Sequence, residues 1–163
     1  MQFENMFYLD HCRDIIKEQI LDLLDDCDDD FYPPLRKRVF LSEKCVTSSE
    51  INNSILRYYH WIMDSSGIIV EEGNKVIGFV AYTVSPDCLY VKNILVAKNH
   101  RNRGIASKLY SMILEVNRTV CIRTWSINQT NIKLLEDNGF TIKEIIKDDR
   151  GDGIDTIFYV REK

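Results

Sequence analysis

The sequence predicts an α/β fold, built on a mixed central sheet of about six to seven strands flanked by about four helices. Two stretches carry this prediction. Residues 68–82 are typical of a β-hairpin, because runs rich in β-branched and aromatic residues flank the short turn Gly73-Asn74. Residues 89–125 contain a strand, a basic loop, a helix and another strand, which implies parallel pairing through a right-handed crossover.

Length and composition predict one domain over residues 1–163. Charged residues make up 28% and apolar residues 45% of the chain, which is ordinary for a soluble protein. No apolar run approaches the about 18 residues of a membrane span, and the N-terminus lacks the pattern of a signal peptide. We therefore expect a cytoplasmic protein without membrane contact. The net charge of −4 argues against a nucleic-acid binder.

The cysteines predict neither a disulfide framework nor a metal site. They are odd in number, widely scattered and without a C-x-x-C pair. The five are Cys12, Cys27, Cys45, Cys88 and Cys121. We expect mostly buried, reduced thiols and no metal cofactor.

The first third of the chain predicts a strand, a helix and a break. Residues 3–8 form the strand, with Phe3, Phe7 and Leu9 available for burial. A helix follows from about Asp10, the expected N-cap. Its apolar residues recur at helical spacing on one side: Ile15, Ile16, Ile20, Leu23 and Leu24. A run of aspartates then opposes the helix dipole and is expected to end the helix: Asp22, Asp25, Asp26, Asp28, Asp29 and Asp30.

The break at residues 31–38 contains two prolines and a basic triplet, Arg36-Lys37-Arg38. It is either a solvated connection or a loop that faces a substrate with its aromatic rings. A second helix is expected from Ser48 or Ser49 to Met63, ended by Ser65-Ser66-Gly67.

After the hairpin and a turn at residues 85–87, we expect strands and helices to alternate along the chain. We expect a strand over residues 89–96 and a helix from Gly104 to about residue 117. The apolar face of that helix comprises Ile105, Leu109, Met112, Ile113 and Val116. A strand over 119–125 and a helix over 130–138, ended by Gly139 at its C′ position, follow. The last two strands are expected at 140–147 and 154–161.

The loop before the helix at Gly104 predicts an anion site. A helix N-terminus offers unpaired N–H groups and a partial positive charge. Lys98, His100, Arg101 and Arg103 surround it. Gly104 permits a close approach of a ligand to the backbone. Together these features indicate a phosphorylated ligand.

This segment resembles a motif of the GNAT superfamily of acyl-CoA-dependent N-acetyltransferases. The motif Arg/Gln-x-x-Gly-x-Gly/Ala is met by Arg101, Gly104 and Ala106. A second family motif, Asn-x-x-Ala-x-x-Leu-Tyr-x-x-x-Gly-Phe, is matched at Asn128, Leu134, Gly139 and Phe140. The expected order of strands and helices is also the order of the GNAT fold, over nearly the whole chain.

The resemblance implies acetyl-CoA as co-substrate and a primary amine as acceptor, either a small molecule or an N-terminal or lysine amine. The pyrophosphate would lie on the loop before the helix, and the pantetheine arm along the strand that ends at residue 96. The implied cofactor residues are Leu95, Val96, Ala97, Arg101, Asn102, Arg103, Gly104, Ile105, Ala106, Ser107 and Asn128. The family also contains many homodimers, so a homodimer is possible here.

The chain departs from the family at the two positions that often carry catalysis. Leu135 occupies the place of the tyrosine acid, and Lys92 the place of a carboxylate base. Glu71, Glu72 and Tyr90 are substitutes by location only, and a water chain is an alternative base. The two departures leave a second hypothesis open, a catalytically quiet domain that binds acetyl-CoA as a sensor or interaction module.

The acceptor site is expected among the first two helices, their connection and the last hairpin. Aromatic residues of these segments are candidates for lining it: Phe31, Tyr32, Tyr58, Trp61 and Phe158. The aspartate run favours a cationic acceptor such as a polyamine or an aminoglycoside, unless it is a solvated helix end.

Overall fold

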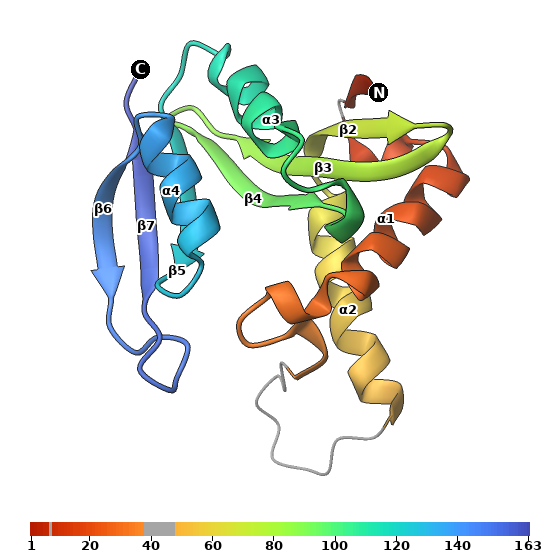
Figure 1. Cartoon of the computed structure of the whole chain (residues 1–163), viewed down its shortest axis with the longest axis horizontal. Helices are drawn as coiled ribbons and strands as arrows, with labels where there is room; N and C mark the ends of the chain where they lie inside the picture. Colours follow the sequence, from red (N-terminus) through yellow and green to blue (C-terminus); the bar gives the residue numbers. More distant parts are fainter. Residues whose placement is uncertain (7, 38–47) are drawn as a thin grey trace.

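The computed structural model describes residues 1–6, 8–37 and 48–163. Its centre is a seven-stranded sheet with the order β1-β2-β3-β4-β5-β7-β6 (Figure 1). The strands are β1 Gln2–Met6, β2 Ser66–Glu72, β3 Lys75–Val84, β4 Leu89–Val96, β5 Val120–Trp125, β6 Thr141–Ile146 and β7 Thr156–Arg161. The α-helices are α1 Asp14–Asp26, α2 Ser48–Met63, α3 Ile105–Leu114 and α4 Gln129–Asp137.

The mixed sheet and the hairpin are confirmed. β4 and β5 pair in parallel, and the other described neighbours pair antiparallel. At the β2–β3 turn, Gly73 and Asn74 have φ values of 59° and 62°. Two successive left-handed residues are what a tight hairpin turn requires, which explains the Gly-Asn pair.

The start of the first helix was predicted wrongly. Asp10 lies in a short 3-10 helix, η1 Leu9–His11, and α1 begins only at Asp14 without a side-chain cap. The cause is Leu9, which is fully buried and donates its N–H to the Ser65 carbonyl, so the chain is anchored before the helix. Ile15 was also misplaced, since its side chain is 52% exposed. Phe7, Arg38 and Cys45 lie outside the described residues.

α3 is shorter than predicted. It ends at Leu114, and tight turns follow, in which Val116 N–H donates to the Ile113 carbonyl. Val116 is therefore 39% exposed rather than on the buried face. α4 ends as expected at Gly139, whose φ of 78° suits a C′ glycine.

The two faces of the sheet carry separate hydrophobic cores. One core packs α1 and α2 against residues of β2, β3 and β4 such as Ile69, Phe79 and Leu95. The other packs α3 and α4 against residues such as Val80 and Tyr159. Of the described cysteines, Cys12 and Cys27 are buried and Cys88 and Cys121 half-buried, all as free thiols. No helix within the described ranges is long and apolar enough to cross a membrane.

The sheet splits between β4 and β5. Pairing of these strands covers Leu89, Tyr90 and Val91 and stops there. At the same point the β3–β4 register shifts, because Ala81 pairs with Asn93 while Tyr82 pairs with Val91, which leaves Lys92 as the bulged residue. A bulge bends and twists its strand. The bulge at Lys92 therefore explains why the remainder of β4 turns away from β5.

Candidate active site

The loop between β4 and α3 presents a row of backbone N–H groups. Asn102 and Gly104 adopt left-handed conformations, with φ values of 60° and 75°. Gly104 is the N-cap of α3 and provides no side-chain cap, and the first bond of the helix runs from Lys108 N–H to the Gly104 carbonyl. The N–H groups of residues 105–107 therefore point out of the helix end, where left-handed residues shape an anion-binding concavity.

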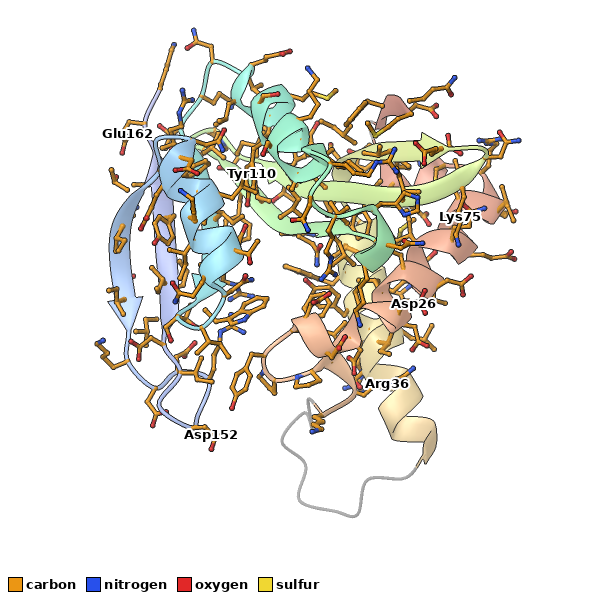
Figure 2. The ribbon with its side chains drawn as sticks, viewed as in Figure 1. Asp26, Arg36, Lys75, Tyr110, Asp152 and Glu162 are labelled. Atoms are coloured by element: carbon orange, nitrogen blue, oxygen red, sulfur yellow. The ribbon has the colours of Figure 1, made fainter. Side chains whose placement is uncertain are left out.

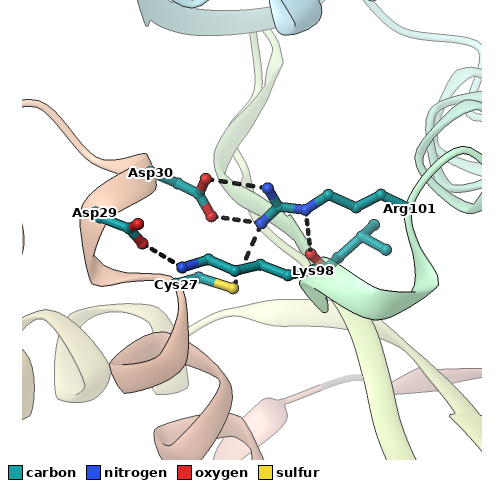
Figure 3. Close-up of polar contacts among 6 residues, drawn as sticks. Cys27, Asp29, Asp30, Lys98 and Arg101 are labelled. Carbon is teal, nitrogen blue, oxygen red and sulfur yellow. Dashed lines mark hydrogen bonds and ion pairs between the residues drawn. The ribbon is translucent and has the colours of Figure 1, made fainter.

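Two of the cations next to this concavity, Lys98 and Arg101, are bound by the aspartate run. Arg101 donates from both terminal nitrogens to the Asp30 carboxylate and from Nε to the Val96 carbonyl, 3.1 Å away (Figure 3). Lys98 forms an ion pair with Asp29. The two aspartates belong to η2 Asp28–Asp30, directly after α1. Asp29 and Asp30 are therefore neither merely solvated residues of a helix end nor unpaired carboxylates that could bind a cationic acceptor.

Glu72 also faces this loop. It accepts hydrogen bonds from both terminal nitrogens of Arg103, at 2.7 and 3.1 Å, and lies 3.5 Å from His100 Nε2. The hydrogen bond from Arg103 lowers the pKa of Glu72, which is opposite to what a general base at neutral pH requires. Glu71 pairs with Arg13 at 3.3 Å. Neither glutamate is brought to the split of the sheet.

The ammonium group of Lys92 binds the C-terminal end of α2. Its Nζ donates to the carbonyls of Trp61, at 2.8 Å, and Asp64, at 3.2 Å, and lies 4.8 Å from the centroid of the Trp61 ring. Leu135 is fully buried in the core between α4 and the sheet. Both departures from the family pattern therefore make structural contacts. Tyr90 is on β4 at the last paired section, and burial raises its pKa, so its phenol stays protonated.

Aromatic rings line the α1–α2 side of the split. The Phe31 ring lies 5.4 Å from that of Tyr58 and 6.4 Å from that of Trp125, and Tyr58 lies 5.4 Å from Trp61. The structure thus brings three of the predicted acceptor residues together and adds Trp125. Phe158 pairs with Arg123 across β5 and β7, and no ring contact joins it to the row within the described residues.

Tyr32 ties the α1–α2 connection to the turn between β6 and β7. Its hydroxyl donates to Asp152, 2.6 Å away, at the turn that Figure 2 labels. Its carbonyl accepts from Arg150, also at 2.6 Å. The Arg150 guanidinium lies 5.1 Å from the centroid of Trp125. The connection is therefore a strap across the split, as well as one wall of it.

Asn93 lies on the strand along which the pantetheine arm is expected, but it is not among the site residues named from the sequence. It is 7% exposed, and its Nδ2 donates to the Tyr58 hydroxyl, 2.7 Å away. A polar asparagine within the strand residues 90–96 is a signal that can be seen in the sequence. The bulge that sets the direction of the Asn93 side chain cannot be seen there. Asn128, predicted to contact the cofactor, caps α4 by accepting the Asn131 N–H. Among the described residues, no group of three metal-ligating side chains exists.

Comparisons with known proteins agree with this geometry. The model of the acetyltransferase (GNAT) family matches residues 19–140. No curated protein matched the chain. Among solved structures, the aminoglycoside 6'-N-acetyltransferase of Enterococcus faecium has a TM-score of 0.71 at 13% identity, over 99% of this chain and 97% of that one. An aminoglycoside 6'-N-acetyltransferase complexed with coenzyme A has a TM-score of 0.70 at 12% identity, over 99% and 97%.

The ribosomal-protein-S18-alanine N-acetyltransferase of Escherichia coli has a TM-score of 0.67 at 13% identity, over 99% of this chain and 92% of that one. At such identities the likeness concerns the fold, and the acceptors of these neighbours differ from one another. The family match covers most of the chain, including the anion-binding loop. The protein belongs to the GNAT family of acetyltransferases.

Proposed function

We propose that this protein transfers the acetyl group of acetyl-CoA to a primary amine, by direct attack in a ternary complex. The observation that carries the proposal is the concavity of uncapped N–H groups at the start of α3, after the end of β4 that has separated from β5. A phosphate-bearing ligand fits the first feature and an extended arm fits the second.

The backbone N–H groups of residues 102–107 are assigned to the pyrophosphate. Arg101 and Arg103 contribute positive charge while they remain bound to Asp30 and Glu72. The pantetheine arm is assigned to the β4 edge around Leu95 and Val96. Ala97 is less available, because its N–H already donates to the Ile77 carbonyl on β3. Asn128 stays a proposed contact from the other side of the split.

When bound, acetyl-CoA supplies an acetyl thioester whose carbonyl carbon the amine attacks. The protein must then hold the amine, donate hydrogen bonds to the oxyanion and provide a proton for the thiolate. A β4 backbone N–H at Leu95 or Val96 is assigned to the oxyanion. Tyr90 is the proposed acid, because its phenol keeps its proton at neutral pH.

The test measures acetyl-CoA binding by calorimetry and free coenzyme A release against a panel of primary amines. Saturable binding together with amine-dependent release is the expected result. Absence of binding would contradict the cofactor assignment. Arg101→Ala with Arg103→Ala is expected to weaken binding, and Tyr90→Phe to lower kcat with little change in acetyl-CoA affinity.

The second candidate is a sensor or interaction module that binds acetyl-CoA without catalysis. The structural roles of Leu135 and Lys92 favour it, since neither usual catalytic position carries an acid or base. It predicts that acetyl-CoA raises the unfolding temperature while release stays at background with every amine.

A further inference from the structure

Within the part of the chain that the structure describes, the buried oxygen of the Asn93 side chain has no hydrogen-bond partner. The side chain lies on β4, one residue past the bulge at Lys92, and is 7% exposed. Its Nδ2 donates to Tyr58, but its Oδ1 has no hydrogen-bond partner among the described residues. A buried, unpaired carboxamide oxygen lowers the stability of a protein. Its presence at the split of a sheet therefore calls for a ligand that donates a hydrogen bond.

The surroundings of Asn93 suit an amine that carries an apolar body. The Tyr58 hydroxyl binds the Asn93 amide, and the ring of Tyr58 contacts that of Phe31, so the two rings form a wall beside the amide. Phe31 is 6% exposed. Aromatic faces bind cations and apolar groups equally well. Two protein cations already lie on the outer rings, Lys92 on Trp61 and Arg150 on Trp125.

The carboxylates near this wall are engaged. Asp30 accepts from Arg101, Asp152 from Tyr32, and Asp149 from Thr156. A second ammonium group on the acceptor would meet Lys92 and Arg150 at the outer rings, whose faces these two cations already occupy. The same two cations favour the neutral form of a bound amine, which is the form that attacks a thioester.

We propose that Asn93 Oδ1 accepts a hydrogen bond from the acceptor amine, and that the site selects monoamines with an apolar or aromatic body over polyamines. The proposal rests on the proposed function and names its acceptor class. Tyr58 is a positioning residue, because its hydroxyl accepts from the carboxamide nitrogen and so fixes the orientation of Oδ1. The carboxamide orients the amine, and water takes the proton that the nitrogen releases as the C–N bond forms and the C–S bond breaks, so no protein carboxylate is required as base.

The test uses 2-phenylethylamine and spermidine as acceptors. Asn93→Leu is expected to lower kcat/KM for 2-phenylethylamine about 10-fold to 100-fold, mainly through the KM for the amine, with the KM for acetyl-CoA unchanged. Wild type is expected to favour 2-phenylethylamine. Full activity of Asn93→Leu, or a preference for spermidine, would overturn the inference while leaving the proposed function intact.

A stability measurement separates this role from a structural one. Asn93→Leu combined with Tyr58→Phe removes both members of the hydrogen bond between them, so the double variant is expected to lose less stability than the two single variants summed. The matched control is Tyr110→Phe, in the other tyrosine–asparagine pair, where Asn131 Oδ1 accepts the Tyr110 hydroxyl at 3.0 Å. The control is expected to lower the unfolding temperature and leave amine selectivity unchanged. A large destabilisation of the double variant would identify Asn93 as structural.

A third measurement does not depend on turnover. Titration of 2-phenylethylamine into the wild-type protein with coenzyme A is expected to shift the side-chain amide signals of Asn93 in an NMR spectrum. If no amine is acetylated but this shift occurs, the proposed function fails and the amine site stands. If the signals do not move at saturating amine, the inference fails.

Discussion

The Asp30 carboxylate and the Arg101 guanidinium form a two-point ion pair that joins the end of α1 to the loop before α3 (Figure 3). The same guanidinium holds the Val96 carbonyl at the end of β4. Asp30 directly precedes Phe31, which is the central ring of the acceptor wall. The pair therefore connects the proposed cofactor loop to the proposed acceptor site.

Asp30→Asn is expected to have opposite effects on stability and binding. It leaves a partly buried guanidinium without its carboxylate, which lowers the free energy of unfolding by about 1 kcal/mol. It also removes a negative charge beside the pyrophosphate site, so acetyl-CoA should bind several-fold more tightly at low salt, about 3-fold to 10-fold. Urea unfolding and calorimetry measure the two effects.

The control for this variant is Asp26→Asn, which makes the same charge change at an exposed position of α1. It is expected to alter affinity less and stability hardly at all. Equal effects of the two variants on stability would show that the ion pair of Asp30 contributes nothing.

Gly104→Ala tests the backbone of the anion-binding loop. A Cβ at this position has open space, so the left-handed φ of 75° is the sole obstacle. We expect a loss of about 1–2 kcal/mol in stability, together with an about 10-fold weaker binding of acetyl-CoA. Gly151→Ala, with a φ of 78° and equally open surroundings, carries the same strain far from the loop. It should cost similar stability and leave acetyl-CoA affinity unchanged.

Lys92→Met tests whether this lysine is structural. The variant loses two hydrogen bonds to carbonyls at the end of α2 and the contact with Trp61, so unfolding should become easier by about 1 kcal/mol. Lys92→Arg keeps the charge and should recover most of the loss. The pH profile of kcat/KM is expected to be the same in Lys92→Met and wild type. Loss of its acidic limb in the variant would instead identify Lys92 as a base.

Glu72→Gln tests the pH dependence of the loop. The hydrogen bond from Arg103 lowers the pKa of Glu72 below its ordinary 4.5. The ion pair therefore stabilises the fold fully above pH 4.5, and its contribution disappears as pH falls through the lower folded value. The unfolding temperature of wild type should exceed that of Glu72→Gln near pH 6, and the difference should vanish towards pH 3. A constant difference would contradict the assignment.

Local features of the sequence predicted the elements and the left-handed glycine at the start of α3. The hairpin turn at Gly73-Asn74 and the loop around Gly104 depend on residues that are neighbours in the chain, so their conformations are visible in the sequence. The same holds for Gly139 at the end of α4.

Tertiary contacts explain what the sequence did not predict. Asp30 and Arg101 are 71 positions apart, and Glu72 and Arg103 are 31 apart, so only the folded chain brings them together. The bulge at Lys92 depends on the register between β3 and β4, which alternation of apolar residues does not specify. The direction of the Asn93 side chain follows from that bulge, and it was missed for this reason.

The position of β7 in the sheet indicates when during folding the proposed acceptor site can form. β7, Thr156–Arg161, lies between β5 and β6 in the sheet, so a strand that follows β6 in the chain fills an interior position. The contacts from Tyr32 to Arg150 and Asp152 span 118 and 120 positions of sequence. Contacts of such separation form late, since closure of long loops opposes them. During synthesis the loop before α3 and its helix are complete well before the strap, so a nascent chain acquires its proposed amine site only as β7 inserts.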